Sequence, residues 1–178
     1  MQSQPIRIKD LTINKFKDLQ DRPGVYIVFW IKNGNPVVIG RICGEDRKGV
    51  LYIGSSRNLR EELRKLWESV ETIVERKKCK RKSYYHTLGP SLIYTGLFQR
   101  VKSEDLWVYV KEFATKEEAE AQERRALLEY TRTFGEPPPL NLQVGREYFL
   151  ILCLGKVGKS KLAQELDPDL KSALGLLN

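Results

Sequence analysis

Two short tyrosine motifs, a glutamate on a helical pattern and a single histidine are the residues of this sequence best suited to acid–base or metal chemistry. The motifs are Gly24-Val25-Tyr26 and Tyr52-Ile53-Gly54, the glutamate is Glu123, and the histidine is His86. Cleavage of a phosphodiester requires a water that loses its proton, a cation at the non-bridging oxygens and stabilisation of the leaving oxygen. A tyrosine, with an unperturbed pKa of about 10, can be a base there only if a cation or metal lowers that pKa.

Glu123 lies on the apolar face of a predicted helix. Ala119, Ala126, Leu127 and Tyr130 stand at −4, +3, +4 and +7 from it, so its carboxylate points toward the sheet that the helix covers. A buried carboxylate is costly unless it is paired or bound to metal. Two interpretations stay open, a metal ligand or an ion pair with a basic neighbour. The two tyrosines have a comparable alternative as core rings with a solvated hydroxyl.

A cluster of positive charge, the basic arm (residues 76–82), precedes His86. Six of its seven residues are basic, and Tyr84 and Tyr85 follow it closely. Phosphate neutralisation dominates affinity for nucleic acid, and tyrosines can stack on unpaired bases. The arm therefore predicts contact with DNA, with a solvated loop of lysines as the alternative. Its basic residues are Arg76, Lys77, Lys78, Lys80, Arg81 and Lys82.

Composition excludes several classes of protein. The 178 residues are 41% hydrophobic and 30% charged, which is typical of one globular domain. No apolar run reaches the roughly 18 residues of a membrane-spanning helix, and the first ten residues lack the apolar centre of a secretory signal. The net charge of +8 and pI of 9.4 favour an anionic partner, either nucleic acid or an acidic surface, and do not choose between the two.

The cysteines and the lone histidine limit the kind of metal site. Cys43, Cys79 and Cys153 are odd in number and far apart, which predicts free thiols in a reducing, intracellular compartment. With one histidine, any divalent ion must be held mainly by carboxylates and water.

The elements that must position these residues follow from hydrophobic patterning and turn signals. We predict strands at 25–31, 37–42, 50–54, 106–113 and 148–154, and a charged loop at 44–49. We predict helices from the cap at Asn58 to about residue 75 and from the capping box at Thr115 to about Thr131, with short helices near Asp167. The prolines at 137–139 cannot remain helical and leave Asn141 in a rigid loop.

The ordered set of PGVY, LYIGSSRNLREEL, EAEAQE and PPPLN, spanning Pro23 to Asn141, resembles the GIY-YIG nuclease superfamily. The resemblance implies an α+β fold with a small mixed or antiparallel sheet flanked by helices, here with an inserted hairpin between the motif strands and a C-terminal extension. The expected organisation is an N-terminal lead over 1–22, the GIY-YIG domain over 23–145 and the extension over 146–178.

The resemblance also implies roles for individual residues. Tyr26 would be the base or water-orienting group and Tyr52 its partner on the neighbouring strand. Glu123 would hold one divalent ion, Mg²⁺ or Mn²⁺, and Asn141 would steady the site or the glutamate. His86 resembles a histidine that some members place near the phosphate, where it could protonate the leaving oxygen or contact DNA.

The sequence departs from the family at Glu62, which stands where the family has an arginine. Residue 62 faces the sheet, whereas Arg60 and Arg64 are rotated from it by roughly 200° along the helix. Lys65, Arg57 or the basic arm could supply the missing cation. Otherwise the site is degenerate and binds without cutting, or an active-site substitution was introduced. A glutamate beside a transferred phosphate repels it.

We therefore expect a metal-dependent endonuclease that hydrolyses duplex or branched DNA by in-line attack of water. The alternative is a weakened or inactive GIY-YIG domain that binds nucleic acid, and a protein-interaction scaffold is a third class. No nucleotide cofactor is expected, because a P-loop ending at Lys159-Ser160 would need glycine where Cys153 stands. The expected DNA contacts are Arg57, Arg60 and Lys65, the six basic residues of the arm, Tyr84 and Tyr85.

Overall fold

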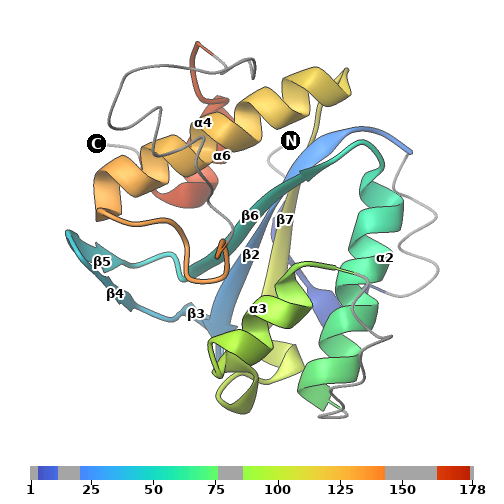
Figure 1. Cartoon of the computed structure of the whole chain (residues 1–178), viewed down its shortest axis with the longest axis vertical. Helices are drawn as coiled ribbons and strands as arrows, with labels where there is room; N and C mark the ends of the chain where they lie inside the picture. Colours follow the sequence, from blue (N-terminus) through green and yellow to red (C-terminus); the bar gives the residue numbers. More distant parts are fainter. Residues whose placement is uncertain (1–3, 12–20, 76–85, 143–163, 177–178) are drawn as a thin grey trace.

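The computed structural model describes residues 4–11, 21–75, 86–142 and 164–176. The protein folds as an antiparallel sheet with helices on both faces (Figure 1). Strand β2 (Gly24–Lys32) lies between β6 (Val50–Ser56) and β7 (Leu106–Glu112) and is antiparallel to both. Short strands β1 (Ile6–Arg7) and β3 (Asn35–Pro36) pair with β7 and with the end of β2. The predicted α+β class with a small antiparallel sheet is confirmed.

Helices cover the two faces of the sheet separately. Helix α2 (Leu59–Val70) continues into a π-helical turn, η2 (Glu71–Glu75), and lies with α3 (Leu88–Tyr94) on one face. Helices α4 (Lys116–Phe134) and α6 (Pro168–Leu174) lie on the other (Figure 1). Single 3₁₀ turns complete the described elements, namely η1 (Ile8–Asp10), η3 (Leu97–Gln99) and η4 (Ser103–Asp105).

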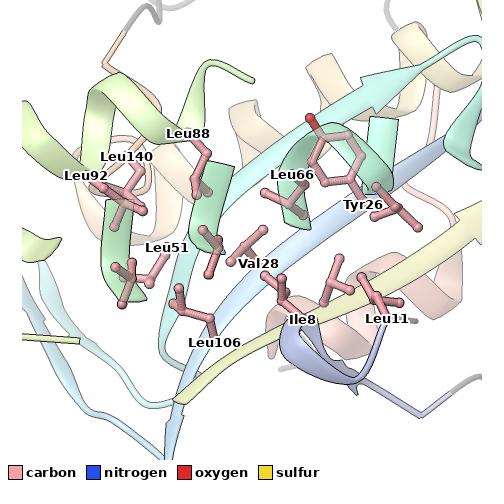
Figure 2. Close-up of a cluster of buried hydrophobic side chains, with 14 of the residues drawn as sticks. Ile8, Leu11, Tyr26, Val28, Leu51, Leu66, Leu88, Leu92, Leu106 and Leu140 are labelled. Atoms are coloured by element: carbon pink, nitrogen blue, oxygen red, sulfur yellow. The ribbon is translucent and has the colours of Figure 1, made fainter. Parts of the chain in front are cut away.

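Alternation along β2 divides the interior into two cores, because successive side chains of a strand point to opposite faces. Tyr26 and Val28 enter the α2-side core, whereas Val25, Ile27 and Phe29 enter the α4-side core. A central strand buried on both faces explains the unbroken apolar run in the sequence. Figure 2 shows Tyr26 at the margin of the α2-side core, with its hydroxyl directed away from Ile8 and Leu11. Other labelled members are Leu51, Leu66, Leu88, Leu92, Leu106 and Leu140.

The capping residues predicted from the sequence start both long helices. Asn58 Oδ1 accepts from the Glu61 N–H at 3.0 Å, and Thr115 Oγ1 accepts from the Glu118 N–H at 3.1 Å. Helix α4 ends at Gly135, whose φ of +78° is a left-handed conformation that favours glycine. The helix that carries Glu123 is thus fixed at both ends by local sequence.

The inserted hairpin follows β2 and precedes β6 in the chain, as predicted, but its strands have other bounds than the predicted ones. Strand β4 (Ile39–Arg41) is shorter than the predicted strand 37–42, and it pairs with β5 (Gly44–Asp46). The prediction of a loop over residues 44–46 was therefore wrong. The reason is physical: a two-stranded hairpin with little buried surface does not need the alternating apolar pattern that marks a strand.

Both ends of the chain contribute to the cores. Ile8 and Leu11, from the lead, are buried in the α2-side core, and Leu170 and Leu174 of α6 are buried in the α4-side core. The predicted strand 148–154 and the P-loop-like segment lie outside the described residues. Within the described part of the chain, no helix is long and apolar enough to cross a membrane.

Candidate active site

The two motif tyrosines lie side by side on the α2 face of the sheet. Tyr26 pairs across the strands with Gly54, and Val28 pairs with Tyr52, so the two phenols are diagonal neighbours. Their ring centroids are 5.9 Å apart and their planes differ by 24°. Two phenol side chains from adjacent strands therefore lie next to each other.

The glycines of the two motifs are required by packing. A Cβ on Gly54 would lie 2.5 Å from Tyr26 Oη, and a Cβ on Gly24 would lie 2.4 Å from the carbonyl oxygen of Lys111 and 2.3 Å from Leu59 Cδ1. Real Cβ atoms do not approach other atoms so closely. Gly54 therefore makes room for the Tyr26 phenol, and Gly24 lets α2 and β7 approach β2.

His86 is buried, with 3% of its surface exposed, and it lies next to the tyrosine pair. Its Nε2 is 2.7 Å from Tyr26 Oη and 3.2 Å from Glu62 Oε1, while its Nδ1 accepts the Leu88 N–H at 2.9 Å. Because Nδ1 accepts a backbone hydrogen bond, the hydrogen-bond network assigns the proton of the neutral ring to Nε2. His86 therefore donates to Tyr26 or Glu62, and this geometry favours a positioning role over protonation of a leaving oxygen.

Glu62 faces the sheet, as predicted, and lies beside His86. Lys65, one of the cations considered as a substitute for the family arginine, lies 2.9 Å from Glu61 on the same helix, and Arg60, whose place on the helix made it a poor substitute, lies 3.5 Å from Asp21. Arg57 is exposed. The site therefore presents a carboxylate where the family presents a guanidinium.

The environment of the two phenols keeps them protonated. Burial raises the pKa of Tyr26 well above its usual value, and Tyr52, Glu62 and Glu123 raise it further. Burial also raises the pKa of Tyr52, although its hydrogen bond with Thr87 Oγ1, at 2.9 Å, opposes that shift. Tyr26 can become a base only if a cation offsets these effects.

Glu123 approaches the same end of the sheet from the α4 face. Its Oε2 accepts the Ser55 hydroxyl at 2.5 Å, and Ser55 pairs with Val25 next to the Tyr26–Gly54 pair. Burial raises the pKa of Glu123, while the Ser55 hydrogen bond and Arg124 oppose the rise. After burial, which is the largest cause, the nearby Glu123 carboxylate contributes to the raised pKa of both phenols. Ser55 was missed by the sequence interpretation, although its place directly after Tyr52-Ile53-Gly54 was a signal.

Asn141 fixes the backbone of β6. Its Nδ2 donates to the Ile53 carbonyl at 2.7 Å, and its Oδ1 accepts the Ile53 N–H at 2.9 Å. The Leu140 N–H donates to the Leu51 carbonyl at 2.9 Å. The loop after α4 thus pairs with the edge of β6, and Asn141 fixes the backbone of Ile53.

The donor set is compatible with one hard divalent ion. Glu123 supplies a carboxylate, the ligand type that Mg²⁺ prefers, and Mg²⁺ in proteins keeps several waters and binds substrate phosphates. Among the described residues, no three histidine, cysteine or acidic side chains gather as a metal cluster. The basic arm, Tyr84 and Tyr85 lie outside the described residues.

Comparison with known proteins adds no relative. No family model, curated protein or solved structure matches this chain. A functional proposal must therefore rest on the site geometry and on the residues that carry the resemblance.

Proposed function

We propose that this chain is a divalent-metal-dependent DNA endonuclease that hydrolyses phosphodiester bonds through a GIY-YIG-type site. One observation carries the proposal: the rings of Tyr26 and Tyr52 lie side by side on one sheet face with centroids 5.9 Å apart, Tyr26 Oη is 2.7 Å from Nε2 of the buried His86, and Glu123 accepts the hydroxyl of Ser55, the residue after Gly54. Two phenols, a half-buried carboxylate and a histidine in one small region are more than core packing requires. Each of the three acidic or phenolic groups has a raised pKa, a feature that clusters at functional sites.

The roles of the residues follow from their contacts. A divalent ion held by Glu123 would neutralise charge on the phosphate and polarise the attacking water. If a cation at the site lowers the pKa of Tyr26 enough to ionise it, the Tyr26 phenolate, which would accept the His86 N–H, would orient that water, take its proton and become the neutral phenol again. Tyr52, held by Thr87, keeps the Tyr26 ring in place. Asn141 holds the intervening β6 backbone.

The positive charge in this proposal comes from the basic arm. The arm ends four residues before His86 and holds six of the 31 lysine and arginine residues of the chain within seven positions. It is therefore the segment best suited to attract DNA to the site. A cation from the arm would also offset the effect of Glu62 on Tyr26.

A second candidate function is favoured by Glu62 itself. Its carboxylate lies beside His86 and raises the pKa of Tyr26, so the site could bind nucleic acid without cutting it. In that case, Glu62→Arg should restore cleavage, because a guanidinium there removes a repelling charge and stabilises the phosphate.

Nicking of supercoiled plasmid tests the two candidates. We expect the wild-type chain to nick the plasmid with Mg²⁺ or Mn²⁺ and to be inactive with a chelator. An inert wild type with an active Glu62→Arg variant would support the binding module instead. A chain that neither nicks nor binds DNA in either form would overturn both.

The role of the arm is tested by the salt dependence of DNA binding. Replacing Lys77, Lys78, Lys80 and Arg81 with alanine should weaken binding and reduce the slope of log K against log salt by up to about 0.9 for each DNA phosphate that is no longer neutralised. The measurement is DNA affinity over a series of salt concentrations. The matched control replaces Lys9, Lys32, Lys48 and Lys102, which lie outside the arm. An equal change in the control would contradict a specific role for the arm.

A further inference from the structure

The inserted hairpin β4–β5 is held to the loop after α4 by polar contacts. The Arg41 side chain is 6% exposed, its guanidinium donates to the Pro137 carbonyl, and its Nε lies 3.4 Å from Glu136 Oε1. The same Glu136 oxygen accepts the Ile42 N–H at 3.1 Å, and the Cys43 N–H donates to the Phe134 carbonyl at 3.0 Å. Arg41 is thus a buried cation that joins the hairpin to the segment leading to Asn141.

The base of the hairpin is joined to β6 and α4 through Asp46, which is fully buried. Asp46 Oδ1 accepts the N–H groups of Lys48 and Gly49, at 2.8 and 3.1 Å. Its Oδ2 accepts the N–H of Val50, the first residue of β6, at 2.8 Å and the Tyr130 hydroxyl at 2.8 Å. Burial and the Asp46 charge raise the pKa of Tyr130, so its hydroxyl remains a donor.

These contacts converge on the segments that carry the candidate site. Strand β6 carries Tyr52, α4 carries Glu123 two turns before Tyr130, and the loop carries Asn141. Asn141 in turn holds Ile53 by two hydrogen bonds. A displacement of the loop would therefore move the backbone between Tyr52 and Gly54.

Hydrophobic burial holds the hairpin at Ile39 of β4, which is partly buried against the α2-side core, but not at the two other apolar positions near its turn and start. Ile42 at its turn is 74% exposed, and Val38 before β4 is exposed as well. The polar contacts of the Arg41 guanidinium and the buried Asp46 carboxylate therefore fix the rest of the hairpin, and charge-assisted hydrogen bonds are directional contacts that specify geometry.

We propose that the inserted hairpin is a positioning element for the tyrosine pair and that Arg41 is its principal positioning residue. Arg41 sets the place of the 136–141 loop, the loop sets Ile53 through Asn141, and Ile53 sets Tyr52 and Gly54. The catalytic consequence rests on the proposed nuclease function, whereas the structural consequence does not. Small displacements of this kind suffice, because a shift of about 1 Å in a reacting group can cost 100-fold in rate.

His86 offers a readout that does not need activity. It is the single histidine of the chain, and its Nε2 contacts Tyr26 Oη. In untagged protein, all imidazole NMR signals therefore come from this one ring and report on the surroundings of the tyrosine pair. We would compare Arg41→Met, Arg41→Lys and, as matched control, Arg47→Met. Arg47 lies just after β5, is 80% exposed and pairs with Glu45.

We expect Arg41→Met to shift the His86 signals and to lower plasmid nicking at saturating DNA by about 10- to 100-fold, with DNA affinity within twofold of wild type. Arg41→Lys should restore part of the rate, because it keeps the charge but loses the guanidinium geometry. Arg47→Met should change neither readout. If Arg41→Met does not fold, the test uses Tyr130→Phe, which removes one hydroxyl donor to Asp46. Tyr130→Phe should change both readouts in the same direction as Arg41→Met.

Unchanged His86 signals in a folded Arg41→Met or Tyr130→Phe protein would overturn the positioning role. If the wild-type chain does not nick DNA but Arg41→Met shifts the signals, the positioning role stands and the proposed nuclease function fails. A loss of nicking that is matched by Arg47→Met would show a general effect of the hairpin charge and would also overturn the role of Arg41.

Discussion

Replacing Glu123 with glutamine should abolish metal-dependent nicking and, at the same time, stabilise the protein at neutral pH. The loss of activity, expected to be about 1,000-fold or more, follows from removal of the proposed metal ligand. Glutamine preserves the size of the side chain and can still accept the Ser55 hydroxyl. The loss would therefore report the missing charge and not a missing hydrogen bond.

The gain in stability follows from the raised pKa of Glu123 in the folded chain. Near pH 3, below the pKa of the group in the unfolded chain, the carboxyl is protonated in both the folded and the unfolded chain. Its ionisation then contributes nothing to the free energy of unfolding. As the pH rises, the unfolded chain ionises first, so the free energy of unfolding falls until the folded pKa is passed. The Glu123→Gln protein should therefore be more stable than wild type at pH 7 and equal to it near pH 3.

Thermal unfolding with and without Mn²⁺ provides the measurement. Mn²⁺ at about 100 times its Kd should stabilise the wild type by about 2.7 kcal/mol and should not stabilise Glu123→Gln. The control is Glu129→Gln on the same helix, where the side chain is paired with Arg125 at 2.9 Å. Full nicking by Glu123→Gln, or equal stabilisation of both proteins by Mn²⁺, would remove Glu123 from the metal site.

The main elements of the fold could be predicted because local signals agreed with long-range packing. The apolar run of β2 is buried on both faces, and the capping residues Asn58 and Thr115 start their helices as the sequence indicates. Strand β5 could not be predicted and the predicted bounds of β4 were too wide, because polar contacts with the 134–137 segment hold the hairpin. Such contacts join residues 94 and 96 positions apart and leave no periodic trace in the sequence.

The sequence predicted that Tyr26, Tyr52 and His86 lie close together, but it did not predict Ser55 or the contacts that these residues make. The motif tyrosines share a face because Tyr26 and Gly54 are paired and Tyr52 is two positions from Gly54. The same alternation places Ser55 on the α4 face, where it meets Glu123. The role of His86 depends on the Leu88 N–H, a backbone contact formed at the start of α3 that the sequence pattern does not specify.

Tyr26→Phe should lower the rate of nicking by about 100- to 10,000-fold, the range expected for loss of an acid–base group. It should also flatten the pH profile. Because the pKa of Tyr26 is raised well above its usual value, the phenolate is scarce at neutral pH. A rate that depends on this phenolate should rise about tenfold per pH unit until the pKa in the metal-loaded site is reached.

The substitution should leave the fold intact, which makes the kinetic result interpretable. Loss of one hydrogen bond costs about 1 kcal/mol, and Glu62, 3.2 Å away, remains as an acceptor for the His86 N–H.

The control for this experiment is Tyr94→Phe, which changes an exposed tyrosine on α3. Single-turnover nicking from pH 6 to pH 10 measures both the rate and its slope. If Tyr26→Phe keeps the wild-type slope, another group titrates in the rate and Tyr26 is not the base. If it keeps the wild-type rate as well, the tyrosine pair serves packing alone, since Phe preserves the ring but not the hydroxyl.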